Sequence, residues 1–230
     1  MITNSTVLLN NPVWHALATE QAQFALGADR ARRFLPEIGP FAAVEAANPA
    51  AFAQLAALIA PGEGIALVGT TPPSGAAWSL LRQPILRQMV YEGAPVEREA
   101  ASAGIVPLSA ADTAPMLELV SLTHPGPFER RTIELGRYVG IWQGGRLAAM
   151  GGERFHLPGY REISAVCTHP DFQRRGYARA LVTYLIGKIQ GEGDVPILHV
   201  VQGNDGAQAL YESLGFRVRA ELMLSVLKRQ

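Results

Sequence analysis

Cysteine is almost absent from this sequence, which holds one thiol, at Cys167. A lone cysteine cannot form a disulfide within the chain. The 5 histidines are scattered and show no metal-ligand spacing, so we expect no metal. The N-terminal residues also lack the basic segment and apolar run of a signal peptide. Together these absences predict a cytoplasmic protein.

An excess of charge of either sign is lacking too. Lysine plus arginine and aspartate plus glutamate number 20 each, so the net charge attracts neither nucleic acid nor an anionic membrane. The most apolar stretch, residues 50–60, is too short to span a bilayer. Hydrophobic residues make up 48% of the chain, which predicts a globular protein with a substantial core. We therefore expect no nucleic-acid or membrane partner, and any functional basic feature must be local.

The first hundred residues are rich in alanine and carry few chemical signals. Helical spacing over residues 50–60 follows Asn48-Pro49, a helix-start signal, and residues 64–69 are typical of a buried strand. The small and polar segment 97–104 predicts a join between two lobes. We therefore divide the chain into an N-terminal α/β lobe, residues 1–104, and a second domain, residues 105–230.

The second domain has a clearer rhythm of strands and helices. The patterns predict strands at 138–143, 146–156, 161–168 and 196–201, helices at 110–122 and 176–190, a helix capped by Asn204, and a last strand from Phe216. Gly144-Gly145 suits a two-residue hairpin turn. A helix between two strands implies a parallel pair, whose carboxyl ends favour ligands. The fold class is therefore α/β with a mixed sheet.

The segment most informative about chemistry runs from Thr168 to Arg179. A helix that opens just after a strand presents free backbone N–H groups and the positive end of its dipole, which together bind anions. Gly176 leaves room for a bulky anion, and Arg174, Arg175 and Arg179 add positive charge. The segment lacks the Gly-Lys-Ser ending of an ATP-type P-loop and the GxGxxG motif of a dinucleotide-binding turn. An ordinary helix start with solvated arginines is the alternative.

These residues resemble the GNAT acetyltransferases. Thr168-x-Pro170 followed by Gln173-Arg174-Arg175-Gly176-Tyr177-Ala178 is similar to the family's Q/R-x-x-G-x-G/A signature, with Ala178 at the second glycine. A second motif lies at the expected distance, in the residues Asn204, Ala207, Leu210, Tyr211, Leu214, Gly215 and Phe216. The resemblance covers residues 105–230. The alanine-rich first half resembles, more weakly, the N-terminal lobe of two-lobed members such as the glycine N-acyltransferase-like branch.

The resemblance implies a GNAT fold with a splayed central parallel strand pair, preceded by a smaller degenerate GNAT-like lobe. It implies acetyl-CoA as co-substrate, with the pyrophosphate in the loop and the pantetheine between the splayed strands. An amide N–H near Val166 would polarise the thioester carbonyl. The residues expected at the coenzyme are Val166, Cys167, Thr168, Gln173, Arg174, Arg175, Gly176, Tyr177, Ala178, Arg179 and Asn204.

Acetyl transfer to an amine needs a general base, and two glutamates are candidates. Glu162 lies at the same distance from Gly176 as the base of the histone-acetylating branch. If Arg161 pairs with His156, Glu153 falls opposite Ser164, on the face that also carries Glu162. A neighbouring carboxylate would then raise the pKa of one of the pair.

The remaining candidates lie on other elements. Tyr211 occupies the position of the family's general acid, with a packing role as the alternative. His199 is a further candidate base, although a buried structural histidine is the stronger interpretation, and Cys167 is interpreted as core. For Phe128, Arg130, Arg131 and Glu134 a solvated charged loop is the default interpretation, and contact with the acceptor is the alternative.

The function predicted from these residues is direct acetyl transfer from acetyl-CoA to a primary amine. The acceptor is left open between a small amine, an amino acid and a protein N-terminus, and a homodimer is left open as well. One alternative is a GNAT fold that senses acyl-CoA without turnover. Another is an acyltransferase for a longer acyl chain.

Overall fold

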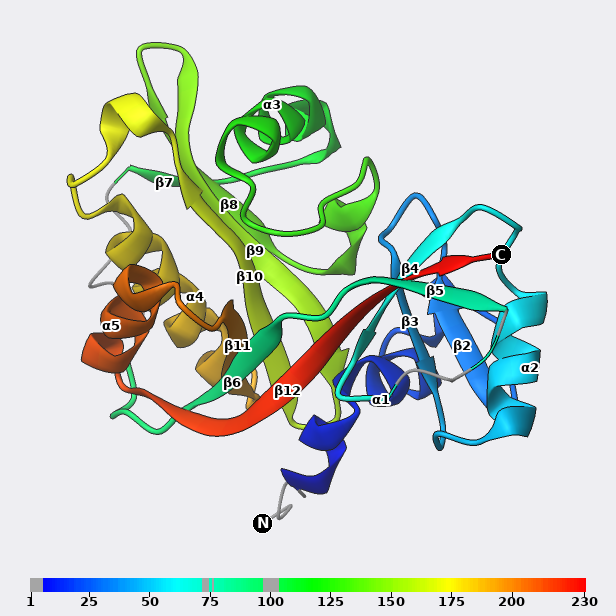
Figure 1. Cartoon of the computed structure of the whole chain (residues 1–230). Helices are drawn as coiled ribbons and strands as arrows, with labels where there is room; N and C mark the ends of the chain where they lie inside the picture. The colour runs from blue at the N-terminus through cyan, green and yellow to red at the C-terminus, as the bar shows by residue number, and fades with distance from the viewer. Residues whose placement is uncertain (1–5, 72–74, 76, 97–103) are drawn as a thin grey trace.

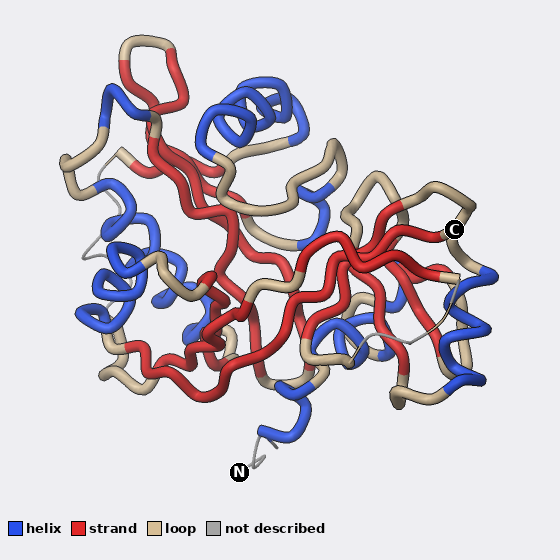
Figure 2. The backbone as a smooth tube through the Cα atoms, viewed as in Figure 1, coloured by secondary structure: helices blue, strands red, loops and turns tan. Residues whose placement is uncertain are grey.

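A computed structural model describes residues 6–71, 75, 77–96 and 104–230 of the chain. Over these residues it has a 12-stranded mixed sheet in the order β1-β2-β3-β4-β12-β6-β11-β10-β9-β8-β7, with β5 paired to β12. This confirms the mixed α/β class. The sheet runs through the whole molecule, as the strands in Figure 2 show.

The elements of the first half are mostly short. They are η1 (Thr6–Asn10), α1 (Pro12–Ala18), η2 (Ala22–Phe24), β1 (Ala25–Leu26), β2 (Ala31–Phe34), β3 (Phe41–Val44), α2 (Pro49–Ala57), β4 (Gly64–Val68), β5 (Trp78–Arg82) and β6 (Ile85–Tyr91). The Asn48 side chain accepts a hydrogen bond from the Ala51 amide and so caps α2, the helix expected after Asn48-Pro49.

The second half follows the predicted order. Its elements are β7 (Ile105–Pro107), η3 (Ala110–Asp112), α3 (Thr113–Thr123), η4 (Thr132–Leu135), β8 (Tyr138–Gln143), β9 (Arg146–Leu157), β10 (Tyr160–Thr168), η5 (Pro170–Phe172), α4 (Tyr177–Gly191), β11 (Val195–Val201), α5 (Asp205–Leu214) and β12 (Phe216–Arg229). Gly144 and Gly145 both have positive φ in the β8–β9 turn, the conformation for which glycine suits a tight hairpin. No helix among the described residues is long and apolar enough to cross a membrane.

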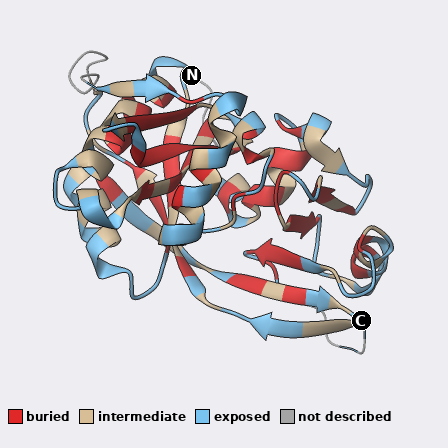
Figure 3. Cartoon of the chain, turned by 90° about the horizontal axis from the view of Figure 1, so that it is seen from above, coloured by how far each residue is buried: buried red, intermediate tan, exposed pale blue. Residues whose placement is uncertain are grey.

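Helices cover both faces of the sheet around β9 and β10. In Figure 1, α3 lies on one face and α4 and α5 lie on the other. The alternation of β9 explains this, because Ala149 packs with the cluster under α4 while the next residue, Met150, packs with the cluster under α3. The buried residues follow the strands through the centre of the molecule (Figure 3).

Strand β6 joins the two halves of the chain. Although it belongs to the first hundred residues, it pairs with β11 on one side and with β12 on the other. The sheet is therefore continuous across residue 104, and the division into two domains stays a prediction. The expected join lies at 97–104, and of these residues 97–103 are outside the described part of the chain.

The parallel strands β10 and β11 separate part of the way along. Their register holds from Tyr160↔Val195 to Glu162↔Ile197, and no further pairing follows toward their carboxyl ends. A bulge in β10 lies just beyond, between Ser164 and Cys167, where Ala165 has a φ of 53°. The splayed parallel pair that the resemblance implied is thus present, and it opens the sheet at the expected place.

Candidate active site

A groove occupies the gap between the carboxyl ends of β10 and β11. It has a volume of about 490 Å³ and is lined along β10 by Ile163, Ser164, Ala165, Val166, Cys167 and Thr168, and along β11 by His199, Val200 and Val201. Because β10 has no partner on this side beyond Glu162, its backbone groups face the groove unpaired by β11. A linear ligand with amide groups can hydrogen-bond to such a free strand edge.

A second cavity, of about 270 Å³, lies at the start of α4 and is continuous in its lining with the groove through Thr168 and Gln173. Phe172, Arg174, Arg175, Gly176, Tyr177, Ala178, Arg179 and Leu210 complete its lining. All the loop residues predicted to contact the coenzyme are therefore brought together here. They surround the free N–H groups at the N-terminus of α4, which favour a bound anion.

Backbone conformation keeps this loop open. Gly176 caps α4 with a φ of 80°, and a Cβ added there would meet no atom within 4 Å. Arg174 is also in the left-handed region, with a φ of 60°. The Arg179 side chain is oriented by a hydrogen bond of 2.6 Å to the Ser213 hydroxyl on α5. The loop thus combines backbone donors, space and positive charge, which is what a pyrophosphate requires.

The far wall of the groove comes from α5. Asn204 caps this helix by accepting a hydrogen bond from the Ala207 amide, and it also lines the groove, so both of its predicted roles are compatible. Tyr211, further along the same helix, also lines the groove and packs edge-on against Phe216. Burial raises the pKa of Tyr211 to about 12, with Cys167 adding to the effect. The phenol therefore stays protonated at neutral pH and can donate its proton.

Glu162 lies beneath the point where the strands separate, and it is fully buried. Arg154 binds its carboxylate with two hydrogen bonds, of 2.8 and 2.6 Å, and His199 Nδ1 donates a third, of 2.7 Å. Burial acts to raise the pKa of Glu162, but the charges and hydrogen bonds of Arg154 and His199 outweigh it and lower the pKa to about 2. Such a carboxylate holds a negative charge firmly and is a weak base near neutrality.

His199 is engaged at both ring nitrogens. Its Nδ1 donates to Glu162, and its Nε2 accepts from the Gln88 amide at 3.0 Å. Gln88 is itself buried and also donates to the Leu9 carbonyl. The histidine is thus held in one tautomer at the junction of β11 and β6, as the interpretation of a structural histidine anticipated.

The expected position of Glu153 is wrong. Arg161 does pair with His156, but a register shift follows, so Glu153 lies opposite Ile163 rather than Ser164. Its side chain points away from Glu162 and is held by Arg137 at 2.7 Å and Arg161 at 3.1 Å. It lines neither cavity described above, and the two carboxylates do not form a pair.

In line with the default interpretation, the candidate acceptor contacts line neither the groove nor the cavity at α4. Phe128 is buried and packs edge-on against Tyr138, while Arg131 forms surface ion pairs with Glu37 and Glu134. The loop instead contributes Pro125, Gly126 and Pro127 to a third cavity, of about 760 Å³, between α3 and the strands of the first half. The rest of its lining is Phe41, Val68, Arg82, Pro84, Leu86, Val120, Ser121, His124, Arg154, His199, Val201 and Leu224.

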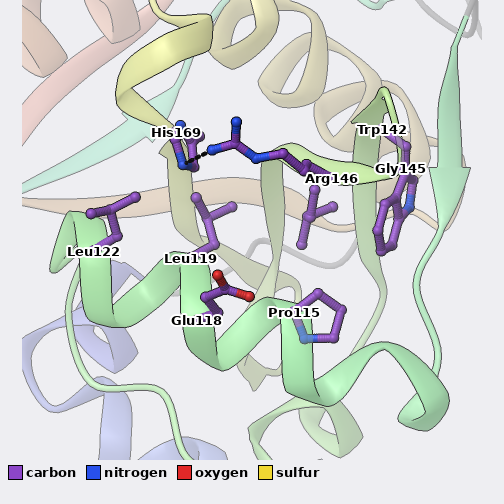
Figure 4. A pocket seen from close by; sticks show the side chains of 9 residues that line it. Pro115, Glu118, Leu119, Leu122, Trp142, Gly145, Arg146 and His169 are labelled. Carbon is purple, nitrogen blue, oxygen red and sulfur yellow. Dashed lines mark hydrogen bonds between the residues drawn. The ribbon is translucent and has the colours of Figure 1, made fainter.

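A small pocket of about 110 Å³ lies between α3 and the β8–β9 hairpin (Figure 4). Arg146 reaches across it to His169 at 2.6 Å, and Glu118, Leu119 and Leu122 line it from the helix. This contact connects the β8–β9 hairpin to the segment that precedes the α4 loop. We therefore assign the Arg146–His169 contact a structural role.

Cys167 is buried among the residues under α3, as predicted for a core thiol. Burial raises its pKa to about 11 against an opposing hydrogen bond with Thr123, so the group is a thiol rather than a thiolate. Among the described residues, no cluster of histidine, cysteine, aspartate and glutamate side chains is suited to a metal ion.

Comparison with known proteins gives a consistent picture. The model of the FR47-like protein family matches residues 138–224. A structure described as an acetyltransferase of the GNAT family, from Novosphingobium aromaticivorans, is 37% identical with a TM-score of 0.89, and the match covers 96% of this chain and 98% of that one. A GCN5-related N-acetyltransferase from Kribbella flavida has a TM-score of 0.60 over 100% of this chain and 96% of its own, at 17% identity, a likeness of fold.

Curated relatives match over shorter stretches. The ribosomal protein bS18-alanine N-acetyltransferase of Escherichia coli K12 is 33% identical over 99 residues, which are 40% of this chain and 66% of that protein. The protein of the same name from Salmonella typhimurium is 48% identical over 52 residues, 22% of this chain and 35% of its own. The chain thus spans between about a third and two thirds of the length of these relatives.

Proposed function

The chain belongs to the GNAT family of acetyltransferases, and on that premise we propose that it transfers an acetyl group directly from acetyl-CoA to a primary amine. The observation that carries the proposal is the separation of β10 and β11 beyond Glu162 and Ile197. It leaves a free strand edge that leads from the anion-binding loop to the interior of the sheet.

The residues fit acetyl-CoA at each end of this path. Arg174, Arg175, Arg179 and the amides at the start of α4 are suited to the pyrophosphate, and the free edge at residues 164–168 is suited to the amides of the pantetheine arm. The co-substrate supplies an activated thioester. The left-handed Ala165 re-aims the backbone of β10, so the Val166 amide is the donor that we assign to the thioester carbonyl.

Tyr211 is assigned as the general acid. Its phenol lines the groove, has no hydrogen-bond partner among the described residues, and is kept protonated by burial. A phenol placed here can give its proton to the departing sulfur. Glu162 is assigned to orient His199 and to neutralise Arg154, because its lowered pKa makes it a poor proton acceptor.

The acceptor enters through the cavity of about 760 Å³. Its lining is mostly aliphatic and prolyl, and the lining residues include two arginines and two histidines but no carboxylate. This favours an amine on an apolar body over a polycationic amine, which would need carboxylates nearby. The volume lies within the range of drug-sized ligands, so an N-terminal segment of a peptide is admitted as well as an amino acid.

Free-CoA release over a panel of amines tests the proposal. The panel contains apolar amino acids and their amides, a polyamine, and peptides that begin with alanine, since the curated relatives are named for an alanine of ribosomal protein bS18. Turnover that is strongest with apolar monoamines supports the proposal. A chain that binds acetyl-CoA tightly, measured by calorimetry, and releases no CoA with any amine is a sensor and overturns it.

A further inference from the structure

The groove of β10 and β11 and the larger acceptor cavity meet at a small set of residues. The side chains that line both are those of His124, Pro125, Arg154, His199 and Val201. An acceptor amine that enters through the larger cavity meets these residues before it reaches a thioester in the groove. A side chain here is therefore well placed to take a proton from the ammonium.

Two of the titratable side chains at the junction, Arg154 and His199, are already engaged by hydrogen bonds to neighbouring residues. Arg154 is held by Glu162 and lies over the rings of Phe41 and Phe155, each at 4.7 Å. Burial lowers the pKa of Arg154, but Glu162 outweighs burial and the net shift is upward, so this guanidinium holds its proton. His199 has both ring nitrogens in hydrogen bonds, to Glu162 and Gln88. Neither side chain offers a free lone pair.

His124 differs from both. It is exposed at the C-terminus of α3, and its imidazole makes no hydrogen bond or ion pair with the described residues. It lines the groove together with Leu122 and Thr123, and the acceptor cavity together with Ser121 and Gly126. Imidazole is the side chain that enzymes use most often as a general base.

The backbone of His124 is also unusual. Its φ of 47° and ψ of 52° place it in the left-handed region, which costs a residue with a Cβ about 1 kcal/mol or more. Pro125 follows directly and further restricts the residue before it. The strain is held by the His124 amide, which donates to the Val120 carbonyl at 2.8 Å. Strained positions of this kind gather at functional sites.

We propose that His124 is the general base that takes the proton from the acceptor ammonium at the junction of the two cavities. This assignment rests on the proposed acetyl transfer. The imidazole accepts one proton and passes it to solvent, to which it is exposed. The freed amine attacks the thioester carbonyl carbon, the C–N bond forms, and the C–S bond breaks. The sulfur takes the phenolic proton of Tyr211, and the second proton lost by the nitrogen restores the phenol.

The test uses variants that respect the left-handed backbone. Asparagine and glycine both adopt this conformation readily, so His124→Asn and His124→Gly remove the imidazole without adding strain. We expect kcat to fall by about 10²- to 10⁴-fold in both, with the Kd of acetyl-CoA unchanged. Added imidazole should restore part of the activity of His124→Gly, in which space for a free ring is created. His15→Asn is the control, because His15 lies on α1 and lines neither cavity.

A second readout does not depend on turnover. In the chain without acetyl-CoA, addition of an accepted amine should shift the ring resonances of His124, assigned with His124→Asn, and leave those of His15 in place. Wild-type kcat in His124→Asn, or an unshifted His124 ring at a saturating amine concentration, overturns the assignment while acetyl transfer stands. A wild-type chain that transfers no acetyl group overturns the proposed function and the assignment together.

Discussion

Replacement of Glu162 by glutamine should cost the fold a large part of its stability. The carboxylate is buried with Arg154 and His199, and together these partners lower its pKa from the usual 4.5 to about 2. At about 1.4 kcal/mol per pKa unit, a shift of this size corresponds to roughly 3 kcal/mol. The variant also leaves the Arg154 charge without its partner, a change that typically costs about 3–5 kcal/mol. We expect a loss of about 3 kcal/mol.

The pH dependence of this loss has a definite sign. Because the folded pKa of Glu162 is below its unfolded value, its contribution is complete above the unfolded pKa. It is lost as the pH falls from 4.5 toward 2, where the folded carboxyl also takes up a proton. The stability gap between wild type and Glu162→Gln should therefore be constant at neutral pH and should narrow in acid.

Urea unfolding, followed by circular dichroism at several pH values, measures both effects. Glu45→Gln, at an exposed position, is the matched control and should leave stability unchanged. Replacing the pair together, as Arg154→Met with Glu162→Leu, should recover part of the loss, because it removes both buried charges. A Glu162→Gln variant as stable as wild type at neutral pH, or a gap that does not narrow in acid, refutes the ion-pair argument.

Three further predictions concern Tyr211 in the groove, Gly176 in the coenzyme loop and the ion pairs of Glu153. Tyr211→Phe should lower kcat by about 10²-fold or more while the calorimetric Kd of acetyl-CoA stays the same, and an unchanged kcat removes Tyr211 as the acid. Gly176→Ala has room for its methyl group but must hold a φ of 80°, so it should destabilise the chain by about 1 kcal/mol and weaken acetyl-CoA binding; unaltered affinity argues against the loop as the pyrophosphate site. Glu153→Gln should lower the melting temperature but preserve kcat, because Glu153 pairs with Arg137 and Arg161 away from both cavities, and a loss of kcat in a fully folded variant would return Glu153 to the catalytic candidates.

Local patterns were sufficient for much of the fold. Turn glycines, helix caps and apolar periodicity are properties of neighbouring residues, so the hairpin at Gly144-Gly145, the cap at Asn204 and the helix after Gly176 could be predicted from short windows. Strand β6 could not be placed this way. Its neighbours β11 and β12 lie more than a hundred residues away in the sequence, and nothing within Ile85–Tyr91 specifies which strands it will pair with.

In the candidate site, too, the residues that are contiguous in sequence could be predicted and those that depend on strand pairing could not. The coenzyme loop is contiguous in sequence, and the structure brings its residues together as one cavity. The two glutamates depended on strand register, and a single bulge after Arg161 was enough to move Glu153 out of alignment with Ser164. Bulges are set by pairing with the neighbouring strand, so a count of residues along β9 and β10 cannot reveal them.

The role that we propose for His124 could not be predicted from the sequence. In the segment Thr123–Gly126 it is one polar residue in a turn, and its role depends on two facts that only the assembled chain provides. The first is the left-handed cap of α3, at which His124 lines the same groove as the end of β10. The second is the engagement of His199 by Gln88, a residue of β6, which removes the competing imidazole from the junction. Gln88 lies on β6, the strand whose pairing could not be predicted. Because it occupies Nε2 of His199 on β11, the base that we propose is His124, at the end of α3.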